Sequence, residues 1–173
     1  MNIFALSLSP KECARWHCDK HVVKMILESA QMVCTTHHLL PNKYCIYDIP
    51  YKMTHKNHPC NKWIRDSLGN YKWLLSLIEE LNKEYKYRYN KTENHKSYNA
   101  IYHLPMPDIP NVGLTPFARA MPDEVKIDSN DNSRFDNVIY SYQNYYRTNK
   151  QHILQYTKRN KPKFLSQKIG KDL

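Results

Sequence analysis

The sequence predicts an all-α protein, a single compact helical domain with three or more long helices and long proline-containing loops. Apolar residues recur at helical spacing in three stretches, residues 16–35, 59–89 and 135–156. The ten prolines lie outside the interiors of these stretches, as helices require. A chain of 173 residues is long enough to close one core without metal or disulfides. We expect one domain over residues 1–157 and a basic C-terminal tail over residues 158–173.

The first seven residues are mostly apolar and predict either a strand or a segment held against the core. Ser9 and Pro10 then begin a helix, with serine as its N-cap and proline in its first turn. The apolar pattern allows this helix to continue to about His38. Residues 40–56 contain two prolines and several tyrosines, which predict an ordered loop.

A second long helix is predicted from Pro59 to about Tyr89, capped by Asn57 or His58. Gly69 lies inside its apolar pattern and is the expected position of a kink.

Residues 90–132 contain five prolines and predict a long irregular loop, of a length that often carries function. The third long helix begins at Asn132 or Phe135 and ends near Tyr156. We expect β structure to be minor.

Composition narrows the class of function. The formal net charge of +10 favours a polyanionic partner, which on charge alone is a nucleic acid or an anionic surface. Of these we expect a nucleic acid, DNA above all, or a nucleotide. An odd number of cysteines, five, and the lack of a long apolar run predict a reduced, cytoplasmic protein with no membrane partner. The three glycines are scattered, which excludes Rossmann and P-loop nucleotide sites. We expect no cofactor.

One narrow polar stripe runs along the first long helical stretch. At about 100° per residue, its side chains fall within an arc of about 80°; they are His17, His21, Lys24, Glu28 and Gln31. Histidine can transfer protons, lysine can act as an amine nucleophile, and glutamate can stabilise a cation. The first four are therefore candidate catalytic residues, and Gln31 is a candidate substrate contact. A solvated helix face with an ordinary Lys24–Glu28 ion pair is the alternative.

A second group of polar side chains gathers where the second long helix begins. Backbone N–H groups at a helix start favour anions. The candidate substrate-binding residues there are Thr54, His55, Asn57 and His58. A helix cap with incidental histidines is the alternative.

A metal site joining the two groups is a further alternative. His17 and His21 have the i, i+4 spacing of helical metal ligands, and His58 and Cys60 would complete the set. The chain has no Cys-x-x-Cys or His-Glu-x-x-His motif.

Four candidate substrate contacts lie in the C-terminal half. Lys158 and Arg159 belong to a basic stretch without acidic residues, and such cations neutralise phosphates. Arg119 and Asp123 lie in the loop segment 113–124, which either places them at a cleft or is a rigid connection.

Several motifs resemble a family of small bacteriophage and bacterial proteins over most of residues 1–125. They are M-N-I-F, H-C-D-K-H-V-V-K-M-I-L-E-S-A-Q-M, T-H-K-N-H-P-C, G-L-T-P-F-A and M-P-D-E. This resemblance favours a phage-type DNA transaction, in the host cytoplasm if the chain is phage-encoded.

The layout is also similar to that of small phage pyrimidine-dimer glycosylase/lyases, which are helical, basic and metal-free. Those enzymes carry a glutamate on an early helix near a catalytic amine, and Glu28 is similar in placement. They expose a processed, small N-terminal residue, whereas the bulky Asn2 should leave Met1 in place. The resemblance therefore implies Lys24 or Met1 as the amine.

Together these observations predict an enzyme that breaks or exchanges a glycosidic bond in a nucleic acid or nucleotide. Glu28 would stabilise the oxocarbenium-like state, Lys24 would be nucleophile or electrostatic group, and His21 would shuttle protons. A metal-dependent nuclease or hydrolase is one alternative, and a non-catalytic nucleic-acid-binding or inhibitor protein is the other. The enzyme hypothesis requires the stripe and the residue 54–60 group to line one pocket.

Overall fold

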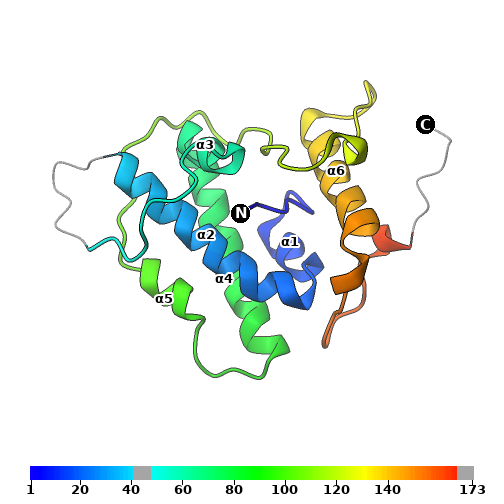
Figure 1. Cartoon of the computed structure of the whole chain (residues 1–173), viewed down its shortest axis with the longest axis horizontal. Coiled ribbons are helices and arrows are strands. Elements are labelled where there is room, and N and C mark those ends of the chain that lie inside the picture. Colours follow the sequence, from blue (N-terminus) through cyan, green and yellow to red (C-terminus); the bar gives the residue numbers. More distant parts are fainter. Residues whose placement is uncertain (41–47, 167–173) are drawn as a thin grey trace.

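The computed structural model describes residues 1–40 and 48–166, and within them the predicted all-α class is confirmed. No strand occurs in this part of the chain, which forms one helical domain (Figure 1). The α-helices are α1 (Pro10–Trp16), α2 (Asp19–Leu39), α3 (Pro59–Asp66), α4 (Leu68–Arg88), α5 (Lys96–Ile101) and α6 (Arg134–Asn149). Short 3-10 helices cover Asp123–Val125, Gln151–Ile153 and Lys163–Leu165.

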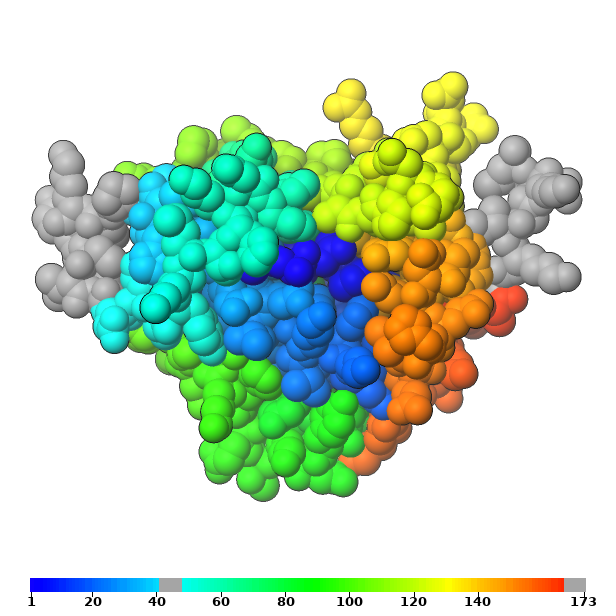
Figure 2. Space-filling view, in the orientation of Figure 1, coloured from blue at the N-terminus to red at the C-terminus, as the bar shows by residue number. Residues whose placement is uncertain are grey.

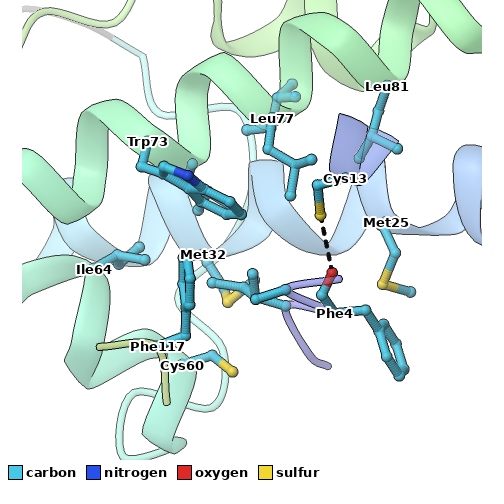
Figure 3. Packing of buried hydrophobic residues seen from close by; sticks show 14 of the residues in the cluster. Phe4, Cys13, Met25, Met32, Cys60, Ile64, Trp73, Leu77, Leu81 and Phe117 are labelled. Carbon is cyan, nitrogen blue, oxygen red and sulfur yellow. Dashed lines mark hydrogen bonds between the residues drawn. The ribbon is translucent and has the colours of Figure 1, made fainter. Parts of the chain in front are cut away.

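The two longest helices, α2 and α4, pack against each other at the centre of the fold, and α1, α3 and α5 pack around them (Figure 1). Apolar side chains from both long helices meet in one core (Figure 3). Buried members shown there are Met25, Met32, Trp73, Leu77 and Leu81. None of the helices in residues 1–40 and 48–166 has the length and hydropathy to cross a membrane.

The prediction of one continuous first helix is wrong, because α1 ends at Trp16 and α2 begins at Asp19. The buried guanidinium of Arg88 fills this break. It donates to the carbonyl oxygens of His17 (2.7 Å) and Arg15 (2.8 Å) and pairs with Asp19 and Glu84. In a continuous helix those carbonyl oxygens would accept from backbone amides of the same helix. The break makes them available to the buried guanidinium, which would be costly to bury without such partners.

The second long helix is also divided, at Ser67 rather than at Gly69. The Ser67 hydroxyl caps α4 by accepting from the Gly69 amide (3.2 Å) and donates to the Gly113 carbonyl (2.6 Å). Gly69 is needed for a different reason, since a Cβ there would lie 2.3 Å from the carbonyl carbon of Gly113. This close approach fixes the 113–120 loop segment against α4.

The N-terminal segment, residues 1–7, is not a strand but is held against the core, the second of the two predicted forms. Its apolar side chains from Ile3 to Leu6 are buried. The Cys13 thiol donates to the Phe4 carbonyl (3.3 Å; Figure 3) and accepts from the Leu6 amide. The segment lies between α1 and α6 (Figure 1).

The third long helix ends at Asn149, earlier than predicted. The chain then returns to the start of α2, where Asp19 accepts hydrogen bonds from the backbone and hydroxyl of Thr157. Further along, Phe164 is buried and packs edge-on against Trp16. Residues up to 166 of the predicted tail therefore pack on the domain, whereas residues 167–173 lie outside the described part.

The 90–132 segment is mostly irregular, as predicted, but it contains the short helix α5, which the sequence analysis missed. The imidazole of His95 caps α5 by accepting from the Ser97 amide (3.1 Å). The predicted loop at residues 40–56 is described only in part, because residues 41–47 lie outside the described residues.

Candidate active site

A buried carboxylate on α2 lies beside the amino group at the start of the chain. Glu28 is 9% exposed, and its Oε2 atom lies 3.4 Å from the amino nitrogen of Met1. The same oxygen accepts from the backbone amide of Asn2 (2.9 Å), while Oε1 lies 3.4 Å from Lys24 Nζ. A buried carboxylate is costly unless charges and donors surround it, and here two amines and one amide do so.

The start of the chain is accessible from one face of the molecule. In Figure 2 the N-terminal residues (dark blue) form the floor of a recess. Its walls come from α2, the start of α3 with the loop before it, the loop before α6, and α6 itself. A ligand entering this recess would meet the N-terminal segment first.

The side chain of Asn2 ties three distant segments together below this recess. Its Nδ2 atom donates to the carbonyl oxygen of Ala120 (2.7 Å). Its Oδ1 atom accepts from the hydroxyl of Tyr142 (3.0 Å) and from the thiol of Cys60 (3.5 Å). The loop before α6, α6 and α3 are thereby all joined to the residue that follows the amine.

The loop that carries the residue 54–60 group is hydrogen-bonded to α2 and, through Asn61, to Met1. Thr54 is joined to Thr35 of α2 by two hydrogen bonds, of 3.1 and 3.2 Å. Asn61, the next residue after this group, donates through Nδ2 to the carbonyl oxygens of Thr54 (3.1 Å) and His55 (2.9 Å) and to the Met1 sulfur (3.2 Å). These bonds hold the residue 54–60 loop next to α2 and the start of the chain.

His58 and Cys60 are the titratable residues of this group that interact electrostatically with the Met1–Glu28 pair. The Nδ1 atom of His58 caps α3 by accepting from the Cys60 amide (3.2 Å). Burial lowers the His58 pKa, as do the positive N-terminus and His55, while Glu28 acts in the opposite direction. His58 is thus neutral at pH 7 and able to accept a proton. Burial raises the pKa of the Cys60 thiol to about 11, so it stays protonated.

His17 and His21 lie in the core, and their hydrogen bonds go to neither Met1 nor Glu28. Nδ1 of His21 lies 2.5 Å from the Tyr146 hydroxyl, and its ring stacks on Phe4 at 4.4 Å. Nδ1 of His17 lies 2.7 Å from the carbonyl oxygen of Cys13. Burial lowers the pKa of His21 to about 3 and that of His17 to about 4, so both are neutral.

The four-residue metal set is not assembled. Within residues 1–40 and 48–166, no three His, Cys, Asp or Glu side chains are grouped so that they could hold a metal ion. His17 and His21 pack against Phe4, whereas His58 and Cys60 contact the helix start and Asn2. The i, i+4 spacing is typical of two metal ligands on one helix. Here the break before α2 leaves His17 outside that helix.

The other α2 and loop candidates differ in exposure. Gln31 is half-buried, one turn beyond Glu28 on α2. His55 and Asn57 are exposed, and His55 Nδ1 lies 2.6 Å from the hydroxyl of Thr54. His55 also has φ = 46°, a conformation that non-glycine residues adopt at a cost.

The four candidates from the C-terminal half make contacts within the fold. Arg119 pairs with Asp128 at 2.6 Å, and the exposed Asp123 pairs with Lys126. Lys158 donates to the carbonyl oxygen of Tyr87 (2.9 Å). Arg159 pairs with the buried Glu84 at 2.6 Å.

Four residues of this site were not predicted from the sequence, namely Asn2, Asn61, Ala120 and Tyr142. Asparagine, alanine and tyrosine carry no chemical signature, and these residues are separated by up to 140 positions. The opening M-N-I-F motif was the only signal for Asn2. The resemblance in layout implied Lys24 or Met1 as the amine, and both nitrogens lie 3.4 Å from an oxygen of Glu28.

Comparison with known proteins gives one match. Residues 1–97 of the 173 match the family of pyrimidine dimer DNA glycosylases. No curated protein and no solved structure gives a significant match. The expected resemblance to phage and bacterial proteins as a separate family stays a prediction.

The matched residues contain α1 to α4, and with them the Met1–Glu28 pair and the residue 54–60 group. This family consists of DNA glycosylases. The similarity of layout first noted at Glu28 of α2 thus extends over more than half of the chain. The expected DNA partner agrees with this family. On this match, the chain belongs to the pyrimidine dimer DNA glycosylase family.

Proposed function

We propose that this protein is a DNA glycosylase/lyase that removes a damaged pyrimidine, with the Met1 amino group as its nucleophile and Glu28 as its acidic partner. The observation that carries the proposal is the 3.4 Å contact between the Met1 nitrogen and Glu28, at the floor of the recess. An amine beside a carboxylate combines a nucleophile with a group that stabilises a cation.

The chemistry follows from these two groups. The neutral amine attacks C1′ of the deoxyribose, the C1′–N bond breaks, and its electron pair leaves with the base. The Glu28 carboxylate stabilises the positive charge that develops on the sugar. Ring opening leaves an imine between the amine and C1′. Loss of a C2′ proton then expels the 3′ phosphate, and water hydrolyses the imine to release the amine.

Neighbouring residues receive supporting roles in this proposal. Lys24, whose side chain is 61% exposed, acts as an electrostatic group rather than as the nucleophile. His58 is neutral and accepts the proton that the amine must lose. His17 and His21 hold Phe4 and thus the floor of the site, in place of the proton shuttle first predicted for His21.

The remaining candidates form the walls and the DNA-facing surface. The target nucleotide must leave the base stack to reach the recess. Gln31, Thr54, His55 and Asn57 lie on elements that border it and would contact the extruded base or its phosphates. The positive potential that attracts DNA would be increased by Arg119, Lys158 and Arg159. The negative charge of Asp123 would reduce this potential near its own position. A DNA substrate fits the reduced cellular compartment predicted from the cysteines.

The proposal is tested by trapping the imine with borohydride. Duplexes containing one cyclobutane pyrimidine dimer, or one abasic site, are incubated with the protein and reduced, and the cross-linked peptide is identified by mass spectrometry. We expect a covalent adduct on the Met1 nitrogen with both duplexes. An adduct on Lys24 would reassign the nucleophile. DNA binding without any adduct would favour the non-catalytic alternative, and chelator-sensitive cleavage without an adduct would favour the metal-dependent one.

A further inference from the structure

Tyr142 of α6 contacts the side chain of Asn2, the residue that follows the amine, and is too buried to reach a substrate. It is completely buried, and its hydroxyl oxygen lies 3.0 Å from Asn2 Oδ1 and 2.7 Å from the Ala118 carbonyl oxygen. The same oxygen accepts the backbone amide of Ala120 at 3.2 Å. All of its hydrogen-bonding capacity is therefore used within the protein.

These contacts form a closed link with Asn2. The single hydroxyl proton of Tyr142 is shared between Asn2 Oδ1 and the Ala118 carbonyl oxygen. The hydroxyl oxygen also accepts from the amide of Ala120, whose carbonyl oxygen accepts from Asn2 Nδ2 at 2.7 Å. Both ends of the Asn2 amide are thereby fixed with respect to α6. The backbone amide of Asn2 in turn donates to Glu28, so the link continues to the carboxylate.

We infer that Tyr142 is a positioning residue that sets the Met1 amine against Glu28 through the side chain of Asn2. This inference rests on the proposed function for its catalytic consequence. Tyr142, Ala118 and Ala120 all lie beyond residues 1–97, the part that matches the family. The C-terminal part of this chain thus completes a site whose reacting groups lie in the matched part.

The physical reason is that a chain end has no covalent neighbour on one side to hold it. Met1 is anchored by its side chain, which is 4% exposed and accepts a hydrogen bond from Asn61. The next residue must fix the remaining freedom of the amine. Small displacements of a reacting group have large effects on rate, so an anchor at Asn2 would contribute to the chemical step rather than to DNA affinity.

The first experiment needs no DNA. Protein is treated briefly with acetic anhydride, and acetylation of the Met1 nitrogen is measured by peptide mass spectrometry. Tyr142→Phe removes only the hydroxyl. Tyr71→Phe is the matched control, since that hydroxyl is equally buried but bonds to His37 (2.9 Å). We expect Met1 to be acetylated about tenfold faster in Tyr142→Phe than in wild type or the control. Equal rates in the two variants would overturn the inference.

The second experiment measures the chemical step. At saturating abasic-site duplex, the single-turnover rate of borohydride trapping should fall about tenfold in Tyr142→Phe, while the half-saturating DNA concentration stays unchanged. Tyr71→Phe should leave both values unchanged. Weaker DNA binding with an unchanged rate would overturn the positioning role.

A third variant separates this inference from simple misfolding and from failure of the proposed function. Asn2→Asp keeps the size of the side chain but loses the donor to Ala120, without altering α6. It should also accelerate acetylation of Met1, and wild-type acetylation in this variant would contradict the link. If wild-type protein gives no DNA adduct, the proposed function fails, whereas the acetylation result still decides the role of Tyr142.

Discussion

The backbone of Gly113 lies so close to Gly69 that Gly69 has no room for a side chain. A Cβ on Gly69 would lie 2.3 Å from the carbonyl carbon of Gly113 and 2.4 Å from its oxygen. Gly113 itself has φ = 81°, which favours glycine. The contact attaches the loop that leads to Ala120 and Arg119 to the start of α4, and so positions one wall of the recess.

Gly69→Ala should therefore destabilise the protein although alanine favours helices. The methyl group must displace backbone of the 113–114 segment, and we expect a loss of about 1–3 kcal/mol in the free energy of unfolding. Chemical denaturation followed by circular dichroism measures it. Ser76→Ala, on an exposed position of the same helix, should change stability by less than about 0.5 kcal/mol. Equal effects of the two substitutions would contradict the close contact.

Arg88→Met should be strongly destabilising. The guanidinium is fully buried and is bonded to Glu84, Asp19 and two carbonyl oxygens, so its removal leaves buried acceptors without a donor. A loss of about 3–5 kcal/mol is expected, measured by urea denaturation. The exposed Lys72 on the same helix provides the control as Lys72→Met. A loss below about 1 kcal/mol for Arg88→Met would show that the break between α1 and α2 does not depend on it.

Stability should decrease as the pH falls below about 6.5. Burial lowers the pKa of His21 to about 3 and of His17 to about 4, from 6.5. The unfolded chain therefore binds more protons between these values, and the stabilisation present above pH 6.5 is lost as the pH falls toward 4. Each histidine contributes a slope of up to about 1.4 kcal/mol per pH unit. His21→Leu should reduce the slope of unfolding free energy against pH, whereas the exposed His152→Gln should not.

Glu28→Gln should abolish turnover while the protein stays folded and binds DNA. Glutamine can still accept from the Asn2 amide, but it carries no charge to stabilise the cationic sugar. A fall of about 100-fold or more in the single-turnover rate is expected. The exposed Glu79→Gln is the control. Unchanged activity in Glu28→Gln would refute the proposed function.

Lys24→Gln should have a much smaller effect than Glu28→Gln. The Lys24 side chain is 61% exposed, and water screens the ion pairs of such a lysine, which contribute about 0–1 kcal/mol. We expect a rate within about tenfold of wild type and an adduct that still forms on Met1. Complete loss of the adduct would instead identify Lys24 as the nucleophile.

Helix periodicity predicted the helical class and the three long apolar stretches, because burial of an amphipathic face is a local property of the sequence. It could not predict the two helix breaks. The first depends on Arg88, which lies 71 positions from its acceptor His17, and the second on Ser67 and its contact with Gly113. Both are tertiary contacts that override a continuous helical pattern.

The candidate site shows the same division. The sequence by itself determined the residue types and their helical spacing, and so identified Glu28 and Lys24 on one helix face and His58 at a helix start. It could not distinguish Glu28 from His21, since both lie on that stripe. Only the tertiary structure decided that Glu28 meets the chain terminus while His21 is covered by Phe4. That difference arises because the N-terminal segment packs across α2, held by Asn2 and Tyr142, and contacts between such distant residues leave no periodic trace in a sequence.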